Sequence, residues 1–373
     1  MPAAPRGAKL GAAAIEAAAK PPAPTPPPFD APRAAVYAIG IGVPVAACLH
    51  FGGPAVALFA GVGAMNALVT DPRRRVAARV VSIACAMAAV LAAAAAGDAL
   101  RARPDLALAL AVLLAYPAGL VPPLFPYVSM VAKLLPLAVI VVATGVFPGG
   151  HVLAGFAAGT LFAAATTLVE GWLRPIAPYA DPLHELVALW RGRRNSVAYA
   201  IAYAGAVALA LAIALALAAP HPLWAVVATL FVMHPDYDRS LRRIGKRIAG
   251  TLVGVAVAWG IVHVVGSPWA LVAIATLAAS LLPWTMARSV FAGTLAATVF
   301  LLVLFDVGMI AQGGDRALVL ARLWDTLIGS AAVAVATVAL RLWRRGHPAP
   351  RTPDVPDPIE PAHAGGVEPL GHL

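Results

Sequence analysis

The chain has 373 residues and a formal net charge of +10, and 61% of its residues are hydrophobic while only 12% are charged. Soluble domains have about 45–50% apolar and about 25% charged residues, so this composition, with a mean hydropathy of +0.85, excludes an ordinary soluble protein and indicates an integral membrane protein. The basic residues stand in short segments between apolar runs, which argues against nucleic-acid binding. The abundant alanine favours helices, and the alternating pattern of a β-barrel is absent from the sequence.

The first 32 residues are rich in alanine and proline and contain no apolar segment of the kind found in signal peptides. We expect residues 1–32 to be a disordered cytoplasmic tail and residues 346–373 to be a second one. Cys48 and Cys85 both lie in apolar runs, so neither a disulfide framework nor a metal site is expected.

Between the tails, apolar runs alternate with short polar segments. A helix needs about 20 apolar residues to cross a membrane. The candidate spans are 34–51, 54–70, 76–97, 105–121, 124–147, 151–172, 197–219, 222–235, 245–266, 268–284, 287–305 and 317–341. The sequence therefore predicts an all-α integral membrane protein with about twelve transmembrane helices. With the N-terminus in the cytoplasm, most Lys and Arg residues fall on the cytoplasmic side, as the positive-inside rule requires. Both termini are then cytoplasmic.

A basic motif occurs twice, each time at the start of a long apolar run. Arg74-Arg75-Val76-x-x-Arg79 opens the first run, and Arg242-Arg243-Ile244-x-x-Arg247 opens the second. Further residues match at nearly the same offset: Met65-Asn66 with Met233-His234, and Gly159, Thr167 and Arg174 with Gly329, Thr337 and Arg344. We therefore expect two parallel six-helix repeats, residues 33–174 and 197–345, because each half has an even number of spans. A cytoplasmic linker, residues 175–196, would join them and could form a short interfacial helix through Leu183, Leu186, Val187 and Trp190.

Charged residues within the spans are the main candidates for function, because charges are costly at membrane depth. Lys133 lies in mid-span, where an ammonium needs a counter-ion, a water-filled cavity or an anionic substrate; the alternative is a lysine that snorkels to the cytoplasmic edge. Arg79 and Arg247 lie one turn inside their spans and could bind an anion arriving from the cytoplasm. The alternative for both arginines is ordinary positive-inside anchoring.

The last span carries an acid and a base on one helix face. Arg322 and Asp325 are spaced i, i+3, so they either neutralise each other or form a proton-coupling pair in which Arg322 tunes Asp325. His234 could titrate near neutral pH, although a histidine before Pro235 is more often a hydrogen-bonded helix terminator.

Other candidates have weaker support from the sequence. Tyr127, Trp284 and Arg288 are predicted to contribute to substrate binding, with Glu170 and Thr294 as further candidates. Prolines around spans four and five and before span eleven point to a substrate region there, because interrupted helices often form transporter sites. The sequence contains no Walker A, HExxH or GxSxG motif, so neither an enzyme nor a cofactor is expected.

The stretch Arg247-x-x-Gly250-Thr251-x-x-Gly254 resembles the FUSC family of fusaric-acid-resistance and aromatic-acid-exporter-like membrane proteins. The later Arg322-x-x-Asp325-Thr326-x-x-Gly329 is similar to the last-span pattern of that family. The resemblance covers roughly residues 33–345 and is stronger in the second half, because the first repeat has Ser82 and Ala86 in place of the two glycines. It implies a bacterial inner-membrane protein that exports aromatic carboxylates or similar toxic amphiphiles.

These observations predict a proton-driven exporter of organic anions. Arg79, Arg247 and Lys133 would attract the carboxylate, apolar walls would hold the ring, and Asp325 would carry the proton. A passive anion channel and a non-transporting membrane scaffold remain as alternatives. The expected partners are a small organic anion and the lipid bilayer, without nucleic acid, and a homo-oligomer is compatible with the sequence.

Overall fold

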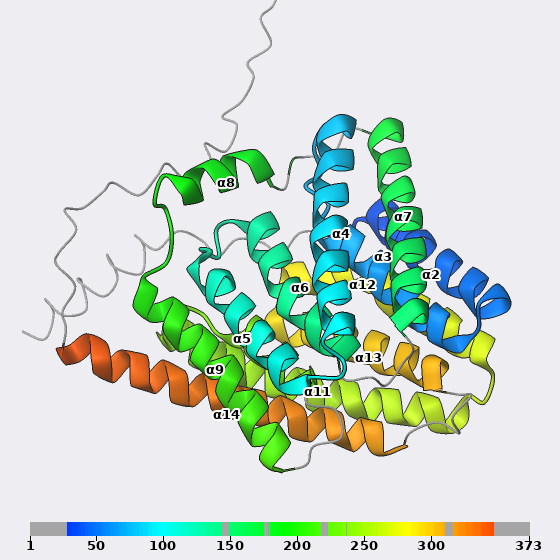
Figure 1. Cartoon of the computed structure of the whole chain (residues 1–373). Coiled ribbons are helices and arrows are strands. Elements are labelled where there is room, and N and C mark those ends of the chain that lie inside the picture. Colours follow the sequence, from blue (N-terminus) through cyan, green and yellow to red (C-terminus); the bar gives the residue numbers. More distant parts are fainter. Residues whose placement is uncertain are drawn as a thin grey trace, which may run out of the picture.

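The computed structural model describes residues 28–143, 149–174, 178, 180–217, 223–235, 237–309 and 316–346. Within these ranges the chain forms helices and no strands (Figure 1). The helices of the first half are α2 (Ala31–Phe51), α3 (Pro54–Val69), α4 (Val76–Ala99), α5 (Pro104–Leu120), α6 (Pro126–Ala143) and α7 (Gly149–Leu173). A short helix, α8 (Pro182–Trp190), follows. The helices of the second half are α9 (Val197–Ala216), α10 (Leu223–Val232), α11 (Tyr237–Val264), α12 (Pro268–Arg288), α13 (Val290–Met309) and α14 (Arg316–Gly346).

Each of the twelve predicted spans corresponds to a helix. Among the described residues, nine helices are long and apolar enough to cross a membrane, and α3 and α5 are shorter apolar helices. The chain is therefore an all-helical protein with multiple membrane-spanning helices. The predicted tails lie almost entirely outside the described residues, except that α2 begins at Ala31, where the Asp30 side chain accepts a hydrogen bond from the Arg33 N–H over 3.0 Å.

The predicted helix in the linker is present as α8, which lies across the end of the bundle near α6 (Figure 1). Its large apolar side chains are exposed: Leu183, Leu186, Val187 and Trp190. The buried residues of α8 are Pro182, Glu185 and Ala188, and the Glu185 carboxylate accepts a hydrogen bond from the Val128 N–H over 2.9 Å. Glu185 thus satisfies a free N–H group at the start of α6 and holds α8 against the bundle.

Two helices extend beyond the predicted apolar runs. The run at 245–266 corresponds to α11, which begins earlier, at Tyr237, and ends at Val264, and the run at 317–341 lies within α14, which ends at Gly346. Arginine and lysine are good helix formers, so the helices continue through the basic segments. Arg242 and Arg243 are therefore helical, whereas Arg73–Arg75 lie in the connection before α4. The first copy has Pro72, and the second copy has no proline at the corresponding place.

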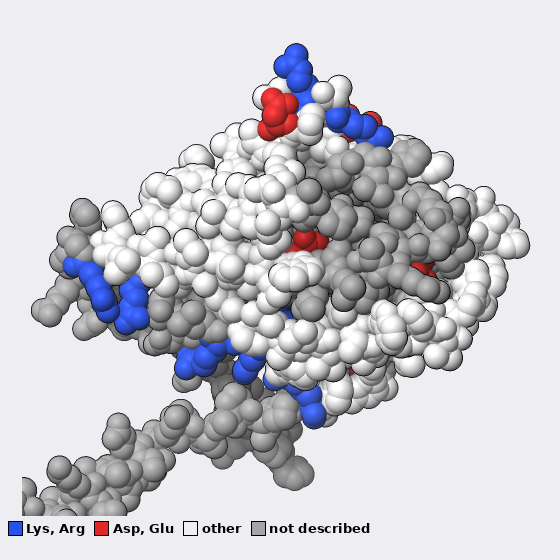
Figure 2. Space-filling view, turned by 90° about the horizontal axis from the view of Figure 1, so that it is seen from below, with Lys and Arg blue, Asp and Glu red and all other residues white. Residues whose placement is uncertain are grey.

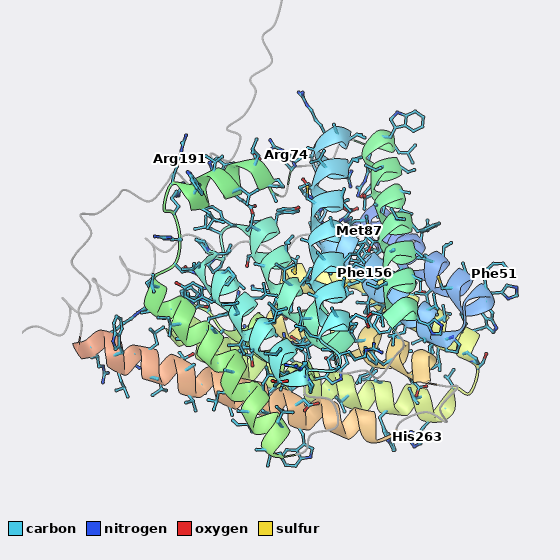
Figure 3. All side chains as sticks on the ribbon, viewed as in Figure 1. Phe51, Arg74, Met87, Phe156, Arg191 and His263 are labelled. Carbon is cyan, nitrogen blue, oxygen red and sulfur yellow. The ribbon has the colours of Figure 1, made fainter. Side chains whose placement is uncertain are left out.

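The side chains at two opposite ends of the bundle differ in charge. Arg74 and Arg191 lie at one end, and Phe51 and His263 lie at the other (Figure 3). In the view of Figure 2, Lys and Arg side chains gather at the top, at the left edge and along the lower edge, and the white area between them shows few charges, one of them an acid near the centre. This arrangement is what a membrane-spanning protein needs, because charges are stable only near the two aqueous surfaces.

The helices of the two halves have corresponding neighbours. Helix α3 packs along α7 and α10 along α14; α4 packs along α6 and α11 along α13; α5 packs against α6 and α12 against α13. Between the halves, α2 contacts α12 and α9 contacts α5, while α3 contacts α13 and α10 contacts α6. The largest hydrophobic core contains buried residues from both halves, so the halves form one packed unit.

Glycine allows the closest of these helix contacts. A Cβ at Gly159 of α7 would collide with the carbonyl oxygen of Ala60 on α3, and a Cβ at Gly329 of α14 would collide with that of Ala225 on α10. The absence of a side chain lets the two backbones touch, which is a common way to pack helices in a membrane.

Candidate functional site

A largely apolar cavity of about 440 Å³ lies between the two halves. It is lined by residues of α3, α4, α6 and α7 from the first half and by residues of α10 to α13 from the second. One part of the wall is aromatic: Phe59, Phe156, Trp224 and Phe305. Pockets for small molecules are usually apolar with a few polar groups, and this cavity has that character. It involves the predicted region around spans five, ten and eleven, but no residue of α5, the predicted span four, lines it.

Two arginines of α11 bring positive charge to this cavity. Arg243 and Arg247 are one turn apart and both line the wall. They lie near the start of α11, and Gly250, one turn after Arg247, packs against Phe291 at the start of α13. Phe305 is near the other end of α13, so the cavity is polarised along this helix, with the cations toward its start and the Phe305 ring toward its end.

The Arg247 guanidinium has unused hydrogen-bonding capacity. Its Nε is buried without a hydrogen-bond partner, and no carboxylate of the described residues lies within ion-pair distance of it. Arg247 as a whole is half-buried, and a partly desolvated cation without a counter-ion is unfavourable, so this position favours an anion. Of the predicted binding residues, Arg247 is the one that lines the cavity with an unmatched charge.

Lys133 of α6 adds a third cation beside this cluster. Its Nζ lies 5.6 Å from the centroid of the Phe231 ring, and Phe231 is part of the cavity wall. Arg243 is close enough to exert a repulsive electrostatic effect on Lys133. Lys133 itself does not line the cavity, so it affects the cavity through the electrostatic field of its ammonium group and through its contact with the Phe231 ring.

Several neutral polar groups line the same cavity. They are Asn66 at the end of α3, Ser289 between α12 and α13, and Thr294 and Thr298 on α13. The Asn66 Oδ1 is buried without a hydrogen-bond partner. Hydroxyl and amide groups of this kind can bind an oxyanion that has already been attracted by the arginines.

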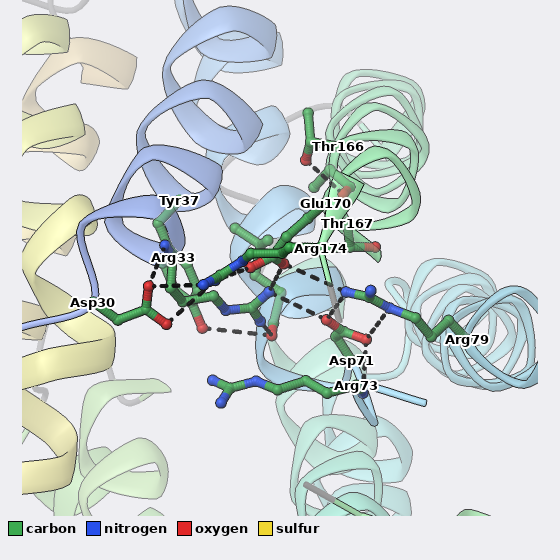
Figure 4. A network of polar contacts seen from close by, with 12 residues as sticks. Asp30, Arg33, Tyr37, Asp71, Arg73, Arg79, Thr166, Thr167, Glu170 and Arg174 are labelled. Carbon is green, nitrogen blue, oxygen red and sulfur yellow. Dashed lines mark hydrogen bonds and ion pairs between the residues drawn. The ribbon is translucent and has the colours of Figure 1, made fainter. Parts of the chain in front are cut away.

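Arg79, the counterpart of Arg247, lies in a different environment (Figure 4). It is fully buried, and its Nε and Nη2 donate to the two carboxylate oxygens of Asp71 over 2.9 and 2.6 Å. Glu170 accepts from Arg33 over 2.5 Å and from Arg174 over 2.6 Å, and it lies 3.5 Å from Arg79. This buried charge network holds α2, the α3–α4 connection, α4 and α7 together.

The charge network is closed within the first half. Arg174 also forms a two-pronged contact with Asp30, over 3.1 and 3.2 Å. Three arginines, Arg33, Arg79 and Arg174, therefore face three carboxylates, Asp30, Asp71 and Glu170. Arg79 is absent from the cavity wall, and its charge is balanced by the chain itself.

The structure separates the other predicted binding residues from the cavity wall. The Tyr127 hydroxyl donates to the Ser82 carbonyl over 2.6 Å. Arg288 is exposed and stacks on Trp284, with its guanidinium 4.3 Å from the ring centroid. Neither Trp284 nor Arg288 lines the cavity, although Met286 and Ser289 from the same segment do.

Two of the predicted proton-coupling residues lie at different places, Asp325 within α14 and His234 in the connection between α10 and α11. Asp325 is fully buried on α14, but it does not line the cavity, and the side chain of Arg322 lies outside the described residues. His234 lines a second pocket, of about 230 Å³, together with residues near the end of α14. The sequence pattern did not single out Asp71, Arg33 or Arg243. An acid that directly precedes a basic cluster, as Asp71 does, was the available signal for the charge network.

The helices and the cavity define a multi-pass membrane protein with a largely apolar chamber that is basic at one end. Residues 207–336 match the model of a family described as fusaric acid resistance protein-like. The match lies in the second half, so the resemblance predicted from the sequence is confirmed there. Comparison with curated proteins and with solved structures gives no match.

Proposed function

We propose that the protein is a bacterial inner-membrane secondary transporter that exports aromatic carboxylates or related organic anions. The observation that carries this proposal is the combination of an apolar cavity with Arg243 and Arg247 at its basic end. An aromatic carboxylate has the matching form, with an apolar ring and one negative charge. The family match over residues 207–336 supports a membrane protein of this type.

The binding mode follows from the positions of the charges. Arg247 would pair with the carboxylate, because it has no carboxylate partner among the described residues. Arg243 and Lys133 would raise the local positive potential and attract the anion from the cytoplasm. The aromatic residues, such as Phe59 and Phe156, would hold the ring.

We further propose that the transporter is built from two duplicated six-helix halves. The matching helix neighbours support this, because α3 with α7 corresponds to α10 with α14, and the contacts between the halves are also reciprocal. The cavity lies between the halves, which is where repeat-based transporters commonly bind substrate. Movement of one half against the other would open the cavity to each side in turn.

A proton gradient is the proposed energy source, with Asp325 as the coupling carboxylate. Asp325 is fully buried in the membrane-spanning part of α14, where a protonated carboxyl is less costly than a charged one. Since Asp325 does not line the cavity, it would act through movement of α14 rather than through contact with the substrate.

Uptake of a labelled aromatic acid into inverted membrane vesicles tests the proposal. We expect uptake that depends on a pH gradient, is strongly reduced in Arg247→Gln and Lys133→Ala, and loses its pH dependence in Asp325→Asn. Arg193→Gln is the matched control, because it removes one positive charge from an exposed position in the α8–α9 connection. Equal uptake by Arg247→Gln and the wild type would refute the binding mode.

A passive anion channel is the second candidate, and the same basic residues favour it. It predicts anion current through reconstituted protein without a pH gradient, together with reduced current in Arg247→Gln. If the anion flux does not depend on the gradient and is unchanged in Asp325→Asn, the protein is a channel and not a transporter. A scaffold without transport activity would give neither uptake nor current in the wild type.

A further inference from the structure

A second pocket, distinct from the cavity between the halves, lies where α14 ends beside the α10–α11 connection. It has a volume of about 230 Å³ and is lined by Met233, His234 and Pro235 on one side. The other side is formed by α14 residues: Thr337, Leu340, Arg341, Arg344 and Arg345. Among the residues of this lining that the structure describes, three are arginines, one is a histidine and none is an acid.

One buried polar group lines this pocket without a partner. Thr337 is 4% exposed, and its Oγ1 makes no hydrogen bond. Its counterpart in the first half, Thr167, donates to the Ala164 carbonyl over 2.8 Å. A buried hydroxyl that lacks the usual helical partner is unfavourable unless a ligand accepts its hydrogen bond.

The corresponding place in the first half is filled by a carboxylate. Glu170 stands three residues after Thr167, and it accepts from Arg33 and Arg174 in the charge network. At the equivalent position three residues after Thr337, the second half has Leu340. The second pocket therefore keeps the arginine that corresponds to Arg174, namely Arg344, but has lost the corresponding acid.

We propose that this pocket binds a phosphate-type oxyanion, supplied by the headgroup of an anionic phospholipid or by free phosphate. Arginine guanidinium groups match the geometry of phosphate oxygens, and Thr337 provides a further donor. The Arg344 Nη2 lies 3.4 Å from the Ser196 Oγ, which positions it at the pocket.

Ordinary membrane anchoring explains these arginines less well. Anchoring requires only that the side chains reach the aqueous surface, and it does not call for a buried hydroxyl beside them. The negative end of the α14 dipole opposes an anion, but it amounts to about half a charge, whereas three arginines line the pocket. The bound oxyanion would link the α10–α11 connection to α14, the helix that carries Asp325.

The test uses the full chain, purified in a neutral detergent and freed of lipid. One arm adds inorganic phosphate at constant ionic strength and measures the thermal unfolding temperature. The other arm adds phosphatidylglycerol or phosphatidylcholine and counts retained lipids by native mass spectrometry. A higher unfolding temperature in phosphate would show that free phosphate is sufficient to occupy the pocket. Selective retention of phosphatidylglycerol without an effect of phosphate would show that the ligand is the lipid headgroup.

The variants separate this pocket from general electrostatic attraction. We expect Arg344→Gln to weaken binding by about tenfold or more, and Thr337→Val to weaken it by about threefold to tenfold. Arg193→Gln, which removes an exposed charge elsewhere on the same end, should bind like the wild type. Equal loss in Arg193→Gln and Arg344→Gln, or unchanged binding in both pocket variants, would overturn the proposal.

A further variant tests whether the chain fills the pocket with its own acids. Asp236 and Asp238 follow the pocket segment in sequence, so the double change Asp236→Asn and Asp238→Asn removes that source of charge. If only this variant binds phosphate or lipid and the wild type does not, the pocket is internally neutralised and the proposal is wrong. Equal binding by this variant and the wild type supports it.

Discussion

Arg79 and Arg247 have corresponding places in the two halves but different electrostatic partners. Arg79 is fully buried between Asp71 and Glu170, whereas Arg247 lines the cavity and has no carboxylate partner among the described residues. The position corresponding to Glu170 is occupied by Leu340. The same residue type thus stabilises the fold in one half and provides a site for an anion in the other.

This difference predicts opposite results for two equivalent substitutions. Arg79→Leu should destabilise the protein by roughly 3–5 kcal/mol, because it leaves buried carboxylates without their partner. Arg247→Leu removes an unmatched cation, so it should leave stability nearly unchanged while abolishing binding of aromatic acids. Thermal unfolding in detergent, followed by a ligand-binding measurement, checks both expectations. A larger loss of stability in Arg247→Leu than in Arg79→Leu would contradict this account.

The sequence predicted part of the site at this scale. It selected Arg247 and Lys133 because charges at membrane depth are unusual, and that reasoning needs no tertiary structure. It could not distinguish Arg79 from Arg247, because the acids near Arg79 come from distant places: Asp71 precedes α4 and Glu170 lies on α7. Whether a charge is balanced depends on which helices pack together, and the local pattern does not contain that information.

At the scale of single helices, each apolar run in the sequence corresponds to a helix of the structure, but the runs do not give the full length of every helix. Apolar runs measure the part of a helix that lies in lipid, and α11 and α14 continue beyond it through basic residues. The amphipathic linker helix was found as α8, although its attachment through Glu185 could not be foreseen, because the Val128 N–H lies on another helix.

The attachment of α8 should depend on pH through Asp181. Burial alone would raise the pKa of Asp181, but hydrogen bonds from the His184 N–H and Arg74 lower it overall from 3.8. Because the pKa is lowered, the Asp181 carboxylate stabilises α8 above about pH 3.8. This stabilisation is lost as the pH falls through the lower pKa that Asp181 has in the folded protein. Hydrogen exchange in α8, corrected for intrinsic rates, should therefore increase at pH 3.

A second acid on α8 acts in the opposite direction and must be separated from Asp181. Burial raises the pKa of Glu185 above 4.5, although hydrogen bonds from the Val128 and Tyr127 N–H groups oppose this. The contribution of Glu185 to the stability of α8 is present below pH 4.5 and is lost as the pH rises through the pKa of Glu185 in the folded protein. Asp181→Asn should remove the increase in exchange at pH 3, and an unchanged increase in this variant would assign the effect to another group.

Close packing between helices gives a second prediction at this scale. Gly159→Ala should destabilise the protein by about 1–3 kcal/mol or more, because the added methyl would collide with the Ala60 carbonyl. Gly205→Ala is the matched control, since a Cβ there meets no atom within 4 Å. Thermal unfolding of both variants in the same detergent provides the measurement. If the two variants unfold at the same temperature, α3 and α7 are not in backbone contact.

For the whole molecule, the sequence predicted an all-helical protein with multiple membrane-spanning helices and the end at which basic residues such as Arg74 and Arg191 lie. Both depend on hydrophobicity and charge along the chain, which can be read without knowing the packing. The sequence located only part of the cavity wall, around spans five, ten and eleven, because the cavity results from reciprocal packing of α3 with α13 and α10 with α6 across the two halves. Helices that are apolar on all sides do not reveal in sequence which side faces a partner.

The arrangement of the ends leads to a prediction about topology. Arg193 follows α8 at the basic end, after an even number of spans counted from the N-terminus. Arg103 lies between α4 and α5, after an odd number of spans. We expect Arg193 to face the cytoplasm and Arg103 to face the opposite side. The two sites should therefore never react with a membrane-impermeant reagent from the same side.

Single cysteines at these positions test the topology directly. The native cysteines are first replaced by Cys48→Ala and Cys85→Ala, and Arg193→Cys or Arg103→Cys is then introduced into that background. A membrane-impermeant maleimide should label Arg193→Cys only in inverted vesicles and Arg103→Cys only in right-side-out vesicles. The cysteine-free protein controls for background labelling. Labelling of both sites in one vesicle type would mean that an even number of spans separates Arg103 from Arg193, and the two basic motifs would then face opposite sides of the membrane.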